Sequence, residues 1–108
     1  MNPILVDAHL DLAYNAVVLG RDLLCPVEEI HALEAVTPAP GGPAGVCMAT
    51  FPALREGRVA IVGGSLFVAP DFKGTLEPLV YRTPQEAHRY AAQQLDYYRR
   101  LADENEQI

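Results

Sequence analysis

Apolar residues gather in short blocks separated by turn residues, and these blocks predict strands and helices in alternation. The nearly unbroken apolar run at residues 4–9 predicts a short opening strand that is covered on both faces. Residues 59–68 predict a second buried strand, bent or bulged at Gly63 and Gly64. A shorter strand is expected at residues 46–49. The chain therefore supplies two or three strands.

The last third of the chain carries the strongest helical pattern. Thr83 is suited to the N-cap, Pro84 to the first helical position and Glu86 to the capping-box position. Beyond them an apolar stripe recurs at helical spacing, and only Gln94 interrupts it. The pattern predicts a helix over residues 83–104. The apolar members of the stripe are Ala87, Tyr90, Ala91, Leu95, Tyr98 and Leu101.

Three shorter segments are also compatible with helices. Pro26 is suited to the first residue of a helix, and Glu28 and Glu29 complement the dipole of its first turn. Residues 51–56 predict a single helical turn. Residues 12–24 could form a helix, although Gly20 interrupts it. The expected buried positions are Val27, Ile30, Leu33 and Val36 after Pro26, and Ala13, Val17 and Leu24 in residues 12–24.

Two segments predict loops, at residues 37–45 and 69–82. The first holds three prolines and three glycines in nine residues, which excludes regular structure. Strands that alternate with helices predict one parallel α/β domain over residues 1–108. A closed eight-stranded barrel needs roughly 200 residues or more. If the fold is a (β/α)8 barrel, this chain is an incomplete N-terminal part of it, with two to three parallel strands.

Composition narrows the possible partners and the compartment. Half of the residues are hydrophobic and the net charge is −6, which argues against disorder and against nucleic-acid binding. The start of the chain lacks the basic region of a signal peptide, and no apolar run is long enough to span a membrane. Cys25 and Cys47 are too few and too far apart for a disulfide framework. We expect a cytoplasmic protein with free thiols.

One group of residues suggests metal chemistry, at the end of the first predicted strand. His9 and Asp11 are two positions apart, so on a strand their side chains project to the same side. An imidazole nitrogen and a carboxylate oxygen both suit zinc, and barrel enzymes carry catalytic groups at strand C-termini. The alternative is a histidine at a strand end beside an aspartate that caps the following helix.

The order of segments resembles the N-terminal part of the renal (membrane) dipeptidase family of metallopeptidases. The apolar strand that runs into Asp7-Ala8-His9-Leu10-Asp11 is similar to the family's opening strand, with its Asp-x-His-x-Asp-Leu motif. Further similar segments follow in the family's order along nearly the whole chain. They are residues 20–22 (GRD), 51–59 (FPALREGRV), 63–68 (GGSLFV) and 83–87 (TPQEA).

This resemblance implies a (β/α)8 barrel that holds two zinc ions at its C-terminal mouth and hydrolyses dipeptides. His9 and Asp11 match two ligands of one zinc ion. The family's other ligands, a glutamate and two histidines on later strands, have no counterpart here. His31 and His88 are expected to be solvated helix residues. A catalytic zinc ion normally takes three protein ligands, so we expect the isolated 108-residue chain to contain no complete catalytic site and to be inactive.

Two other functions remain open. One is another amidohydrolase-type hydrolase acting on an amide, lactone or phosphate ester, although many such enzymes begin with His-x-His. The other is a non-catalytic α/β interaction module, which could form a homo-oligomer through exposed strand edges and apolar faces. We expect that no histidine or acid is placed to activate Ser65, that Cys47 is buried, and that the tyrosines of the last helix pack in the core or at an interface.

Overall fold

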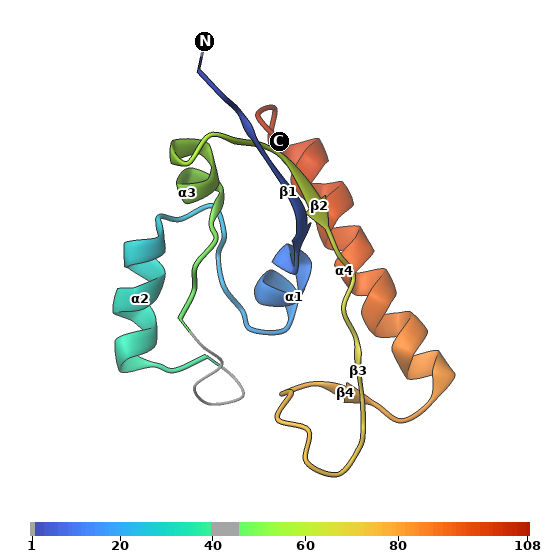
Figure 1. Ribbon diagram of the computed structural model, residues 1–108. Helices are drawn as coiled ribbons and strands as arrows, with labels where there is room; N and C mark the ends of the chain where they lie inside the picture. Colours follow the sequence, from blue (N-terminus) through green and yellow to red (C-terminus); the bar gives the residue numbers. More distant parts are fainter. Residues whose placement is uncertain (1, 40–45) are drawn as a thin grey trace.

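A pair of parallel strands forms the centre of the molecule (Figure 1). The computed structural model describes residues 2–39 and 46–108. Strand β1 (Leu5–Leu10) pairs with β2 (Val59–Gly64). The opening strand is confirmed, one residue later than predicted. The crossover between β1 and β2 contains helices, so the α/β class is also confirmed.

In the part of the chain that the structure describes, four helices surround this pair. They are α1 (Leu12–Val17), α2 (Val27–Val36), α3 (Phe51–Glu56) and α4 (Pro84–Glu104). Helix α4 packs against α1, and α3 packs against β2. Figure 1 shows α2 and α3 on one side of the strand pair and α4 on the other. The short helix at residues 51–56 and the long C-terminal helix are therefore confirmed.

The segment at residues 69–82, predicted to be a loop, contains two short strands. Strand β3 (Ala69–Pro70) pairs in parallel with β4 (Val80–Tyr81). Backbone hydrogen bonding between segments about ten residues apart has no local signature in sequence, which is why the prediction of a loop was incomplete. Of the loop predicted at residues 37–45, residues 40–45 lie outside the described part, and residues 37–39 lie outside any helix or strand.

The second strand is shorter than predicted because it ends with its glycines. Both lie inside β2, and residues 65–68 lie outside any strand. A Cβ atom added at Gly63 would lie 2.3 Å from the Ala8 carbonyl oxygen, and one at Gly64 would lie 2.9 Å from the Tyr98 ring. The two glycines therefore allow β1 and α4 to approach the strand closely.

The strand predicted at residues 46–49 is absent from the described structure. This segment instead runs across the inner side of α2, where Cys47 is buried as predicted and its carbonyl oxygen lies 2.8 Å from the His31 Nε2 atom. The Phe51 amide then donates to the Leu23 carbonyl at 2.8 Å. Contacts with α2 and the Leu23 segment thus hold this stretch where the sequence predicted sheet pairing.

The core lies beside the strands, among α1, α2 and the segment after residue 45. It is built on Leu12, Leu23, Ile30 and Cys47. Of the stripe predicted on α2 only Ile30 is buried, while Leu33 and Val36 are 65% and 83% exposed. The core contacts the side of α2 that carries Ile30, and Leu33 and Val36 lie outside that contact.

Helix α1 ends before the predicted stripe is complete. It stops at Val17, and Gly20 follows with φ +70. Ala13 is buried, but Val17 and Leu24 are exposed. The glycine turn redirects the chain, so these three positions do not share a helical face.

Gln94, which interrupts the apolar stripe of α4, is 1% exposed. Its side-chain amide donates to the Phe67 carbonyl at 2.6 Å and accepts from the Phe67 amide at 2.8 Å. This polar residue therefore holds the backbone that follows β2. Among residues 2–39 and 46–108, no helix combines the length and apolar character needed to cross a membrane.

Apolar side chains of the central strands remain accessible, contrary to the prediction that both faces of the first strand are covered. Every residue of β1 and β2 is exposed or half-buried. Leu5 and Val6 in β1 are 54% and 63% exposed, and Ile61 in β2 is 59% exposed. The described helices therefore leave much of the apolar surface of these two strands uncovered.

Candidate metal site at the end of β1

His9 and Asp11 meet at the C-terminal end of β1. His9 lies in the strand, and Asp11 is the N-cap residue of α1. The His9 Nε2 atom lies 3.4 Å from Asp11 Oδ1, and their side chains are 69% and 41% exposed. The two predicted ligands therefore face each other at an accessible position.

The backbone around His9 departs from regular pairing. Asp7 is opposite Val62 and Leu10 is opposite Gly64, so β1 has one residue more than β2 in this interval. Such a bulge redirects side chains at a strand end. The Asp7 carboxylate accepts a hydrogen bond from the His9 amide at 3.0 Å, which holds the backbone here.

The Asp11 carboxylate is not used as a helix cap, although an aspartate at this position commonly is. Its side chain makes no capping hydrogen bond to α1, a helix whose residues the structure describes throughout. The Ala13 amide instead donates to the Tyr98 hydroxyl of α4 at 3.1 Å. This arrangement disfavours the alternative in which Asp11 serves only to cap the helix.

Ser65 completes the surroundings of Asp11. Its hydroxyl donates a hydrogen bond to Asp11 Oδ1 and lies 3.2 Å from the Leu10 carbonyl oxygen. The expectation that no acid is placed beside Ser65 was therefore wrong, because the fold brings Asp11 next to it. Ser65 directly follows β2, and parallel strands bring their C-terminal ends to the same edge, which is the signal that could have revealed this contact.

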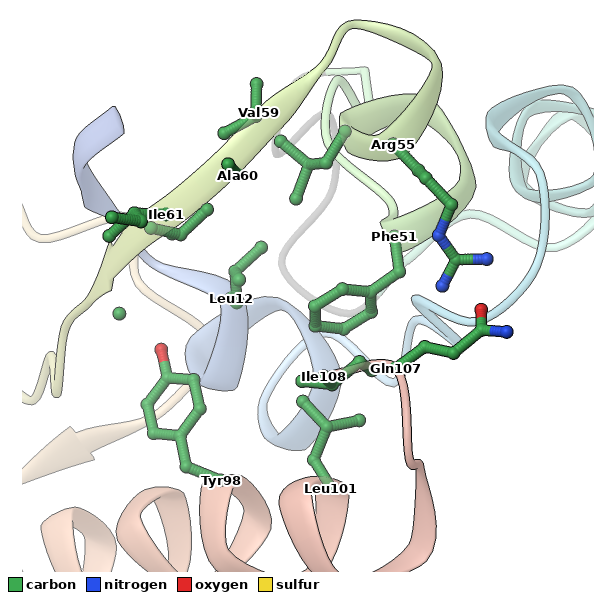
Figure 2. Close-up of a pocket in the computed structure, with 13 residues that line it drawn as sticks. Leu12, Phe51, Arg55, Val59, Ala60, Ile61, Tyr98, Leu101, Gln107 and Ile108 are labelled. Atoms are coloured by element: carbon green, nitrogen blue, oxygen red, sulfur yellow. The ribbon is translucent and has the colours of Figure 1, made fainter. Parts of the chain in front are cut away.

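Tyr98 connects the site to α4, as Figure 2 indicates by the direction of its side chain toward β2 and Leu12. Its hydroxyl donates to the Ser65 carbonyl at 2.9 Å and accepts from the Ala13 amide. Burial raises the pKa of this phenol above its usual range. Tyr98 therefore keeps its proton at neutral pH, as the donation to Ser65 requires.

The other histidines lie elsewhere. His31 and His88 are exposed on α2 and α4, as predicted, although His31 also contacts the Cys47 carbonyl. Within residues 2–39 and 46–108, no group of three or more His, Cys, Asp or Glu side chains could hold a metal ion. In this part of the chain, His9 and Asp11 could supply two ligands of a site that needs more.

No family model, curated protein or solved structure matches this chain. The resemblance to dipeptidases therefore stays a prediction, which rests on the sequence segments alone.

An apolar groove of about 740 Å³ lies between β2, α3 and α4, with Tyr98 in its wall (Figure 2). Its wall includes Phe51, Val59, Ile61 and Leu101, with Arg55 at one side. His9 and Asp11 are not part of it. None of the residues that line it is a histidine, aspartate or glutamate, so its chemistry differs from that of the metal site.

Proposed function

We propose that His9 and Asp11 are two ligands of a zinc ion in a cytoplasmic, metal-dependent hydrolase of dipeptides. The observation that carries this proposal is the 3.4 Å separation of His9 Nε2 and Asp11 Oδ1. Two ligands of one tetrahedral zinc ion, bound at their usual lengths, lie about 3.3–3.5 Å apart. A direct hydrogen bond is normally shorter, at about 2.7–3.2 Å.

The surroundings of the pair also support this proposal. Asp11 has a hydroxyl donor in Ser65 and does not cap α1. A hydrogen bond to a carboxylate that binds a metal ion orients that carboxylate toward the ion. The exposure of His9 leaves room for further ligands and for a substrate. Cys25 and Cys47 are free thiols, which is the usual state of cysteines in a reducing compartment.

The parallel pairing of β1 and β2 fits the first part of a (β/α)8 barrel, whose catalytic groups gather at strand C-termini. A zinc ion there would polarise the peptide carbonyl and lower the pKa of a bound water toward 7. His9 and Asp11 would fix the ion's position. We expect the 108-residue chain to lack hydrolytic activity, because two protein ligands do not complete a catalytic zinc site.

Metal titration of the chain tests the ligand assignment. We expect Zn²⁺ to shift the NMR signals of the His9 imidazole, and His9→Ala or Asp11→Ala to weaken binding at least tenfold. His88→Ala is the matched control, because His88 is exposed on α4. Equal binding by wild type and the two site variants would contradict the assignment.

The proposed activity needs a separate assay. The full-length product of the gene should hydrolyse a simple dipeptide, and a chelator should abolish the activity. Hydrolysis that resists the chelator would contradict a metallo-dipeptidase. Turnover of a lactone or phosphate ester without dipeptide cleavage would favour the other amidohydrolase-type activity.

A non-catalytic α/β module is the second candidate. The exposed apolar residues Leu5, Val6 and Ile61 on the central strands favour it, because such surfaces commonly bind partners. This function predicts that wild type and the His9 variant bind the same partner equally well, with no effect of metal.

A further inference from the structure

The N-terminus of α1 is capped by another helix. The first amides of a helix lack partners within it, and the side chain of the N-cap residue usually accepts from one of them. Here the Tyr98 hydroxyl, 85 residues away in sequence, accepts from Ala13. Ala13 is fully buried, so water cannot easily replace this acceptor.

The same hydroxyl is linked to the proposed ligand. Tyr98 donates to the Ser65 carbonyl at 2.9 Å, and the Ser65 hydroxyl donates to Asp11 Oδ1. The Ser65 amide also donates to the Leu10 carbonyl at 3.1 Å. A continuous set of hydrogen bonds thus runs from α4, through the end of β2, to the carboxylate beside His9.

We propose that Tyr98 and Ser65 are positioning residues of the His9–Asp11 metal site. Tyr98 caps α1 in place of Asp11, and Ser65 holds the carboxylate that is thereby released toward His9. This inference rests on the proposed function, since it assumes that the pair binds a metal ion.

The proposal has a specific structural consequence. When the Tyr98 hydroxyl is removed, the buried Ala13 amide lacks an acceptor. The Asp11 carboxylate occupies the N-cap position and is the nearest group of the type that caps helices. It should rotate to accept from the Ala13 amide, and so move away from His9.

Four variants test the proposal. We expect Tyr98→Phe and Ser65→Ala each to weaken Zn²⁺ binding about tenfold, at the lower end of the loss seen when a residue that supports a metal ligand is replaced. Ser65→Thr keeps the hydroxyl and should bind like wild type. Tyr97→Phe is the matched control, because Tyr97 is a half-buried neighbour on the same helix. Circular dichroism should show that each variant is folded.

The outcomes separate this inference from the proposed function. If wild type binds Zn²⁺ and both Tyr98→Phe and Ser65→Ala bind equally well, the inference is wrong and the ligand assignment stands. If wild type does not bind, the ligand assignment itself is wrong. A structure of Tyr98→Phe supplies a readout without metal: Asp11 should lie within hydrogen-bonding distance of the Ala13 amide, and an unchanged Asp11 would overturn the inference. If Tyr98→Phe does not fold, Ser65→Ala decides.

Discussion

At the scale of single residues, one partly buried ion pair ties the first two helices together. The Arg21 side chain is 4% exposed, and its Nε atom lies 2.6 Å from Glu34 Oε1. A second contact joins Nη2 to Glu34 Oε2 at 3.1 Å, and Nη1 donates to the Asn15 side chain at 2.7 Å. This two-point geometry is the strong form of an arginine–carboxylate pair. The hydrogen bond from Arg21 lowers the pKa of Glu34 below its usual value.

Replacing Glu34 should therefore expose the energetic role of this pair. Glu34→Gln replaces the carboxylate that binds the buried guanidinium with a neutral amide, and we expect the free energy of unfolding to fall by about 1.5–3 kcal/mol, as for a hydrogen bond to a charged group. Urea unfolding at neutral pH measures the loss. Glu28→Gln, on the exposed side of α2, is the control and should change stability little.

The same pair predicts a pH dependence of stability. The hydrogen bond from Arg21 holds the pKa of Glu34 in the folded state below the 4.5 of an unperturbed glutamate, so its contribution is complete above that pH. It should be lost as the pH falls below 4.5 toward the folded pKa, because the unfolded chain takes up the proton first. Acid unfolding of Glu34→Gln should be less steep over that range. Parallel acid profiles would contradict this assignment.

At the scale of elements, the strongest local signals gave the most accurate prediction. Helix α4 begins after Thr83, whose hydroxyl accepts from the Glu86 amide at 3.1 Å. The Glu86 carboxylate accepts from the Arg82 amide at 2.7 Å. In a capping box it would accept from the amide of the N-cap residue, which here is Thr83. Caps depend on residues three or four apart, so they can be recognised without tertiary information. The prediction of a strand at residues 46–49 was wrong, because strand pairing requires a partner that is distant in sequence.

Removing the cap of α4 should weaken the fold. We expect Thr83→Ala to lower the free energy of unfolding by about 1 kcal/mol, because the Glu86 amide loses its acceptor. Thermal or urea unfolding measures the change. Gln85→Ala, at an exposed position in the same turn, should leave stability nearly unchanged. A Thr83→Ala variant as stable as wild type would show that the cap contributes nothing measurable.

At the scale of the whole molecule, the chain is less compact than its length allows. Its radius of gyration is 14.9 Å, whereas a domain of about 100 residues has about 13 Å. The described part of β1 pairs with β2 alone, and its apolar residues Leu5 and Val6 are more than half exposed. A strand with a free edge and apolar side chains is prone to pair with other chains.

We therefore expect the isolated chain to self-associate. Size-exclusion chromatography with light scattering should give an apparent mass that rises with concentration. Val6→Lys should shift the protein toward monomer, since an edge lysine opposes pairing. Val36→Lys is the control, because Val36 is 83% exposed on α2. A wild-type chain that stays monomeric at every concentration would contradict this prediction.

The sequence by itself determined the elements whose signals are local: the opening strand, the helix at residues 51–56 and the long helix. Only the tertiary structure decided that Ser65 and Tyr98 surround Asp11 and that Gln94 is buried. It also decided that the central strands stay exposed. The physical reason is distance along the chain. A helix cap or a strand alternation depends on neighbours in sequence. The contacts of Ser65 with Asp11, of Tyr98 with Ala13 and of Gln94 with Phe67 instead join residues 27 to 85 positions apart.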